Sequence, residues 1–177
     1  MTWKRFRQAA VALAAAALAL GALLAALKSQ WDAEYYEGYN PAAPLNAAVL
    51  SDEPREGYRR VAFAFDGLPG EAVPSLLAMP PQGDEPFPCI IFLHGIGQDK
   101  DFLDVIASRF TAGGFAIASY DQYTRGERNI ENDNVFNGIA GLRRRAAMNV
   151  IDTRRMIDYF AQRGDIDMNR IYLLGAS

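Results

Sequence analysis

The stretch Ile171-Tyr-Leu-Leu-Gly-Ala-Ser177 (IYLLGAS) is a short apolar run that breaks into Gly-x-Ser. A short apolar run bounded by turn residues is typical of a strand, so we expect one over Ile171 to Leu174. Gly-x-Ser alone is a weak signal, because Gly and Ser are common enough for it to occur by chance about once in 200 residues. Its meaning therefore depends on the sequence before it.

Two similar runs precede this stretch, with helical patterns between them. Pro88 to Leu93 is nearly all apolar and Phe115 to Tyr120 has the same character, as expected for strands covered on both faces. Apolar residues recur at helical spacing in Asp101 to Ala112 and in Leu142 to Arg163. Strands that alternate with helices predict an α/β fold with a mostly parallel sheet. We expect Asp165 to Asn169 to be a polar loop.

A hairpin is expected at the start of this sheet. Apolar residues alternate with small ones from Tyr58 to Asp66, and a second run, Val73 to Met79, comes after the turn Gly67-Leu-Pro-Gly70. Two β-like runs joined by a Gly/Pro turn are typical of antiparallel neighbours.

The N-terminus has a different composition. Lys4, Arg5 and Arg7 precede nineteen uncharged residues, Ala9 to Leu27, which Lys28 closes. As a helix this run would be about 28 Å long, close to the hydrocarbon thickness of a bilayer. It is either a cleaved signal peptide or a retained anchor, and its length favours the anchor. The positive flank predicts an extracytoplasmic location for the rest of the chain, as a single-pass membrane protein or, after cleavage, an exported soluble one.

The chain therefore divides into three parts: a signal anchor or signal peptide over 1–28, a juxtamembrane linker over 29–57 and a globular domain over 58–177. The linker carries charges, aromatics and prolines without a sustained period. The whole chain of 177 residues is 50% hydrophobic and 22% charged, which suits one domain with a sizeable core.

Charge and cysteine content exclude several classes of partner and cofactor. A net charge of -3 and a short basic cluster, Arg143 to Arg145, do not predict nucleic-acid binding. The single cysteine, Cys89, excludes an intrachain disulfide and a zinc site of several thiolates, and its apolar neighbours indicate a buried side chain. We expect no metal site.

Three strand ends carry the residues of interest: His94-Gly-Ile-Gly97, the segment that begins at Asp121, and Gly175-Ala-Ser177. In open α/β sheets, ligands bind at the carboxyl ends of the strands. We therefore expect these three segments to meet at one edge of the sheet.

The order and spacing of FLHGIG, SYDQYTRGE and DIDMNRIYLLGAS resemble the α/β-hydrolase superfamily. The likeness is closest to dienelactone hydrolase-like and prolyl oligopeptidase-like esterases and peptidases. It covers about Tyr58 to Ser177, the amino-terminal half of such a domain. The resemblance implies an α/β-hydrolase-type sheet truncated at the strand that bears the nucleophile.

The resemblance assigns roles to two segments. Gly175, Ala176 and Ser177 match the first three positions of the Gly-x-Ser-x-Gly elbow, so Ser177 resembles the catalytic nucleophile and its two neighbours are suitably small. The loop His94 to Gly97 matches the oxyanion loop, with the Ile96 N–H as donor, and Gly95 and Gly97 would let the backbone approach a carbonyl.

The sequence departs from the pattern of the family in several respects. The second elbow glycine, the acid and the base of this family would all lie beyond Ser177, because its triad runs serine, acid, histidine along the chain. His94 precedes the serine, so we interpret it as a loop-shaping residue, and Asp121 as a hydrogen-bonding group at a sheet end. Arg125, Glu127 and Arg128 could pair with one another or face a substrate.

The sequence predicts a membrane-anchored, exported serine hydrolase that acts on a carboxylic ester, or on a peptide, through an acyl-enzyme. Its membrane contact would be residues 9–27, its substrate a small ester or peptide, and no cofactor is implied. The 177-residue fragment is predicted to be inactive. The alternative is a non-catalytic binding or scaffolding module on the same frame, tethered to the membrane.

Overall fold

A computed structural model describes the chain except for residues 1–2, 37, 84, 130–134 and 177. It divides into two compact units, Met1–Glu37 and Gly38–Ser177. The first is the single helix α1 (Trp3–Tyr36). The strands of the second are β1 (Ala48–Arg55), β2 (Tyr58–Asp66), β3 (Ala72–Met79), β4 (Phe87–Leu93), β5 (Ala116–Tyr120) and β6 (Ile166–Gly175). Its helices are η1 (Lys100–Phe102), α2 (Leu103–Thr111), η2 (Gly126–Arg128) and α3 (Val135–Ala161).

The six strands form one mixed sheet in the order β1-β2-β3-β5-β4-β6. β1, β2 and β3 are antiparallel neighbours, which confirms the predicted hairpin of β2 and β3. β4 pairs in parallel with β5 on one side and with β6 on the other. The three strands predicted to be parallel neighbours are therefore adjacent.

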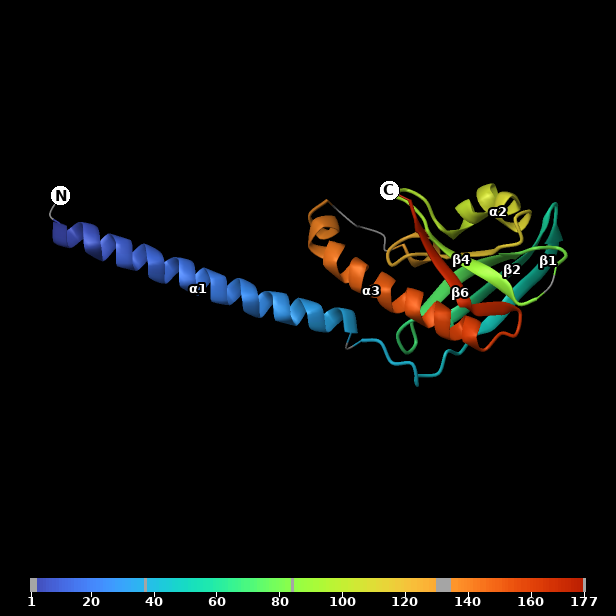
Figure 1. Cartoon of the computed structure of the whole chain (residues 1–177), viewed down its shortest axis with the longest axis horizontal. Coiled ribbons are helices and arrows are strands. Elements are labelled where there is room, and N and C mark those ends of the chain that lie inside the picture. Colours follow the sequence, from blue (N-terminus) through green and yellow to red (C-terminus); the bar gives the residue numbers. More distant parts are fainter. Residues whose placement is uncertain (1–2, 37, 84, 130–134, 177) are drawn as a thin grey trace. The chain divides into compact units, whose positions relative to one another are not determined.

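Helices cover both faces of this sheet, as Figure 1 shows. On one face Leu103 and Ala107 of α2 pack against Leu76, Phe92 and Ile117 of the sheet. On the other face α3 contributes to a second apolar cluster of buried residues. Its members include Phe63, Phe65, Met79, Ile91, Met156 and Phe160. This three-layer arrangement, with helices on both faces of one sheet, is an α/β fold.

Two expectations about loops were wrong. The linker expected over 29–57 contains a strand, β1, and the polar loop expected over Asp165 to Asn169 is largely the start of β6. These strands lie at the two edges of the sheet and expose most of their residues. The residues of β1 and of the first half of β6 are largely exposed, so they lack the apolar alternation that marks a half-buried strand.

The helix α1 is longer than the predicted apolar segment and continues past Lys28 to Tyr36. Within it Arg7–Gln30 contains an 18-residue window with a mean hydropathy of 2.5 and is long and apolar enough to cross a membrane, a property that an N-terminal signal sequence shares.

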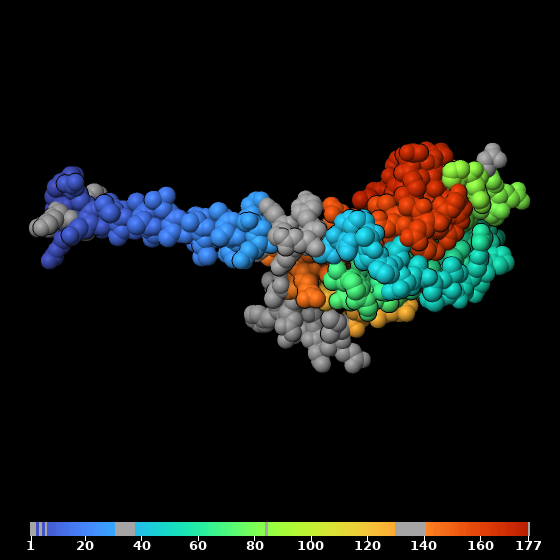
Figure 2. Space-filling view, turned by 90° about the horizontal axis from the view of Figure 1, so that it is seen from below, coloured from blue at the N-terminus to red at the C-terminus, as the bar shows by residue number. Residues whose placement is uncertain are grey.

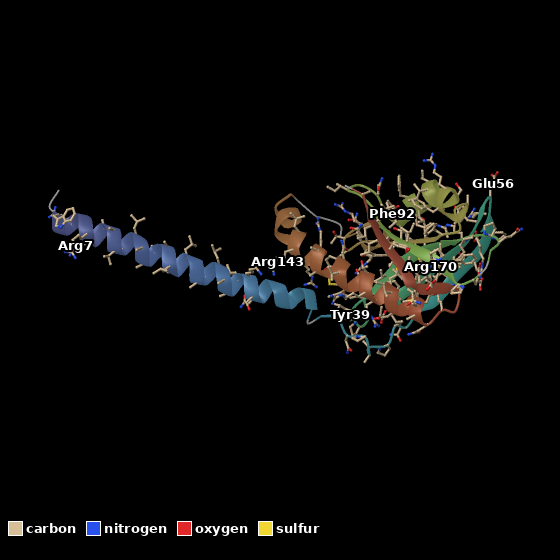
Figure 3. The ribbon with its side chains drawn as sticks, viewed as in Figure 1. Arg7, Tyr39, Glu56, Phe92, Arg143 and Arg170 are labelled. Atoms are coloured by element: carbon tan, nitrogen blue, oxygen red, sulfur yellow. The ribbon has the colours of Figure 1, made fainter. Side chains whose placement is uncertain are left out.

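A buried arginine ties the first residues of the second unit to α3. Arg155, with 1% of its surface exposed, donates to four carbonyls and one carboxylate. Its acceptors are the carbonyls of Asn40, Ala43, Pro44 and Asp66 and the side chain of Asp158. Tyr39, labelled in Figure 3, donates its hydroxyl to Asp158 over 2.9 Å. The segment before β1 is thus hydrogen-bonded onto the domain.

Candidate active site

The path of the chain brings the ends of β4 and β6 together. β5 lies on one side of β4 and β6 on the other, so the chain reverses its direction of winding at β4. Such a switch point leaves a crevice at the carboxyl ends of the strands. There Leu93 pairs with Gly175, and the Ala176 N–H donates to the Leu93 carbonyl over 3.1 Å.

The glycine loop after β4 folds against this strand end. The Gly95 N–H donates to Gln98 Oε1 over 2.9 Å, and the Gln98 N–H donates back to the Gly95 carbonyl over 3.2 Å. Gly97 has φ +81°, a conformation that favours glycine. A Cβ placed on Gly95 would lie 3.5 Å from the Ala176 carbonyl oxygen, so the two backbones are in contact distance.

The structure thus brings together Gly95 and Ala176 and places Gly175 in register with β4. The Ile96 side chain is 91% exposed at the tip of the loop. Ser177 lies outside the described residues, so its role as nucleophile and that of the Ile96 N–H as oxyanion donor stay predictions.

His94 is buried and hydrogen-bonded within the loops. Its Nδ1 lies 3.3 Å from the Gly95 carbonyl oxygen, its Nε2 accepts from the Gln122 N–H over 3.4 Å, and its carbonyl accepts from Gln122 Nε2 over 2.8 Å. These contacts join the loop after β4 to the loop after β5.

Asp121 organises the loop after β5. Its carboxylate is completely buried and accepts from the Lys100 N–H, the Lys100 ammonium and the Glu127 N–H, at 3.0, 3.0 and 2.9 Å. Lys100 also reaches Glu127 over 2.6 Å. Burial alone would lower the pKa of Lys100, but its hydrogen bonds to Glu127 and Asp121 raise it.

A second buried ion pair holds the same loop to α3. Arg128 donates to Asp152 over 2.6 Å and to the Asp121 carbonyl over 3.2 Å, and it lies 5.4 Å from the centre of the Tyr123 ring. Burial raises the pKa of Asp152 to about 6, against the opposing effect of Arg128. Neither Lys100 nor Asp152 was predicted from the sequence as part of the site. Asp152 could have been found from its position on the apolar side of the predicted helix, beside Ile151 and Met156, because a carboxylate there is expected to be buried and paired.

Of the three residues whose roles the sequence left open, two are paired, Glu127 with Lys100 and Arg128 with Asp152. The Arg125 side chain makes no hydrogen bond or ion pair with any residue that the structure describes. It lines a cavity of about 400 Å³ beside Ala176, whose other walls include His94, Ile96, Gln122, Leu142 and Asn149. A cavity thus lies at the predicted strand ends.

Within the described part of the chain, no three His, Cys, Asp or Glu residues are grouped to hold a metal.

Comparisons with known proteins agree with the fold. No protein-family model and no curated protein sequence matches the chain. Among solved structures, an acetyl xylan esterase from Paenibacillus sp. R4 is similar at TM-score 0.62 and 17% identity, over 84% of this chain and 50% of that one. A methylesterase is similar at TM-score 0.65 and 21% identity, over 84% and 35%. A glucuronoyl esterase from Solibacter usitatus is similar at TM-score 0.56 and 21% identity, over 79% and 48%.

These similar proteins are esterases, and the chain spans half of their length or less. At such low identity the likeness shows the fold, which is of the α/β-hydrolase type, and leaves the chemistry of this chain to its own residues.

Proposed function

We propose that the whole protein is a membrane-anchored, exported serine hydrolase that cleaves a carboxylic ester through an acyl-enzyme. The observation that carries this proposal is the contact between Gly95 and Ala176, which brings the glycine loop to the strand end that precedes Ser177. In an α/β-hydrolase-type fold this is where the nucleophile and the oxyanion donors meet. The esterase names of the similar structures support an ester rather than a peptide substrate.

In this mechanism the Ser177 hydroxyl attacks the carbonyl carbon, and the Ile96 N–H donates to the oxyanion that forms. The alcohol leaves with a proton from the general base, and water then hydrolyses the acyl-serine and restores the hydroxyl. His94 is engaged by Gln122 and Gly95. We therefore assign the base and the acid to residues after Ser177 in the whole protein.

The test uses the whole protein in detergent, with a fluorophosphonate probe and hydrolysis of p-nitrophenyl acetate. We expect wild type to be labelled and active, and Ser177→Ala to lose labelling and at least about a thousandfold in kcat, because the acyl-enzyme cannot form. Ser108→Ala, a change of an exposed serine on α2, is the control and should retain both.

An unlabelled, inactive wild type would contradict the proposal and favour the non-catalytic binding module. Labelling that survives in Ser177→Ala would place the nucleophile elsewhere.

A further inference from the structure

A second cavity, of about 310 Å³, lies on the other half of the glycine loop. His94 and Ile96 line the cavity beside Ala176, whereas Gly97, Gln98 and Asp99 line this one. Its remaining lining residues come from the segment after β5 and include Thr124, Arg125 and Asn129. Arg125 lines both cavities, so the two adjoin at this side chain.

The polar groups around this cavity are largely unused by the protein. The side chains of Arg125 and Asn129 make no hydrogen bond to a described residue, and the Thr124 hydroxyl is buried without a partner there. Among the described residues, Gln98 uses its Oε1 alone, to accept from Gly95, and Asp99 uses its Oδ1 alone, to accept from the Asp101 N–H. Hydrogen-bond donors and acceptors on several sides of this cavity therefore remain available to a ligand.

The mixture of groups discriminates between ligand classes. A phosphate or carboxylate site gathers positive charge, but here Asp99 offsets the single positive charge of Arg125. A cation site would need more than one carboxylate, and a lipid site would need apolar side chains, which are missing among the described residues of this lining. A ligand rich in hydroxyl groups fits, because each hydroxyl both donates and accepts a hydrogen bond.

We propose that this polar cavity binds a neutral sugar, the alcohol part of the ester that the enzyme cleaves. This inference rests on the proposed function. The acyl group would lie in the adjoining cavity, where Ile96 and Leu142 offer exposed apolar side chains. The bond between the acyl carbon and the sugar oxygen breaks, Ser177 Oγ takes the acyl group, and the sugar oxygen leaves with the proton that the serine gave to the base. Water then releases the carboxylic acid.

The first experiment measures binding and needs no catalysis. The full chain, in a detergent without a sugar headgroup, is titrated with xylotetraose, and amide signals are followed by nuclear magnetic resonance. We expect saturable shifts at Gly97, Gln98 and Asn129, and none with glycerol at equal hydroxyl concentration. The double change Arg125→Leu with Asn129→Leu should weaken binding at least tenfold. Arg109→Leu, on an exposed arginine of α2, is the matched control and should bind as wild type does.

The second experiment measures selectivity in the whole protein. We compare kcat/KM for per-O-acetylated methyl xyloside with kcat/KM for p-nitrophenyl acetate, which has no sugar. Asn129→Leu should lower the ratio of the two at least fivefold, and Arg109→Leu should leave it unchanged.

The two experiments separate the two proposals. Hydrolysis of p-nitrophenyl acetate without saturable sugar binding, or with an unchanged ratio in Asn129→Leu, overturns the sugar site and leaves the esterase. Sugar binding at these residues with no hydrolysis of either ester supports the site and overturns the proposed function.

Discussion

Asp152 is a completely buried carboxylate on α3. Its side chain has no exposed surface, one carboxylate oxygen accepts from Arg128, and the other has no hydrogen-bond partner among the described residues. That second oxygen faces Gly67, where a Cβ would collide with it. The other charged or titratable groups that act on Asp152 are Glu71 and Tyr120, the last residue of β5. The ionised form is therefore poorly stabilised, which is why its pKa is about 6.

The first prediction concerns pH. Because the pKa of Asp152 is higher in the folded state than its ordinary value of 3.8, the folded state binds this proton more tightly. Acidification through pH 6 should therefore stabilise wild type relative to Asp152→Asn, by about 2 kcal/mol between pH 7 and pH 4.5. Thermal unfolding of both proteins, followed by circular dichroism at each pH, measures this difference. Parallel pH profiles would contradict it.

The second prediction concerns Gly67. Gly67→Ala should lower the free energy of unfolding by about 1–3 kcal/mol, because the new methyl group overlaps Asp152 Oδ1 and lies 3.0 Å from Val73 Cγ2. Gly164→Ala is the matched control, since nothing lies within 4 Å of a Cβ there. The control should be neutral or stabilising by up to about 1 kcal/mol. Equal denaturation midpoints for the two variants would show that the Gly67 contact is not tight.

At the scale of elements, α3 both covers the sheet and holds loops. Its apolar side packs on the sheet through Met156 and Phe160, and its polar groups hold loops at both ends of the domain. Near its middle, Asn149 donates to Gln122 over 3.0 Å and accepts from the Tyr123 N–H over 3.2 Å. One helix thus positions the loop after β5, while its Arg155 holds the segment before β1.

The third prediction tests this second attachment. Arg155→Ala should lower the free energy of unfolding by about 3–5 kcal/mol, because four carbonyls and Asp158 lose a buried partner. Proteolysis between Asn40 and Asn46 should become faster. Arg154→Ala, which changes the neighbouring arginine over the Tyr39 ring, should cost about 1 kcal/mol or less. Equal effects of the two changes would mean that Arg155 does not hold the segment.

At the scale of the whole molecule, the two units carry different surfaces. The helix α1 exposes large apolar side chains along its length, including Val11, Leu18 and Leu24. The domain exposes a run of apolar side chains on its last strand, where Tyr172, Leu173 and Leu174 are 40 to 60% exposed. Figure 2 shows the C-terminal part of the domain, in red, at the surface. A surface strand edge of this kind is a site where further strands or another chain can pair.

The fourth prediction concerns topology. Since Lys4, Arg5 and Arg7 precede the apolar segment, we expect the domain to be extracytoplasmic. Cys89 is buried and its pKa is raised to about 12 by burial, so the native thiol should not react with maleimides. A cysteine introduced at the exposed Gln82 provides a clean reporter. Gln82→Cys should be labelled by a membrane-impermeant maleimide in intact cells, and wild type should stay unlabelled even after lysis. Labelling of the variant only after lysis would place the domain in the cytoplasm.

Local patterns in the sequence determined most of the strands and helices of this protein. The strands β2 to β5, the helix α2 and most of α3 carry their own apolar periodicity, because each buries a continuous stripe or face. The order of strands and helices then restricts the topology to a parallel, doubly covered core that begins with a hairpin. For the same reason the glycine loop and the elbow could be expected at one sheet edge.

Only the tertiary structure decided the rest. The edge strand β1 has no apolar alternation, and its place in the sheet comes from the hydrogen bonds of its backbone to β2, which any residue except proline can make. The partners of Asp121, Asp152 and Arg155 lie far away along the chain. A buried charge requires a partner, but the sequence does not say which one, because the crossing of distant segments brings the two together. The polar cavity beside Gly97 exists for the same reason, since its two walls meet only after β4 and β5 have paired.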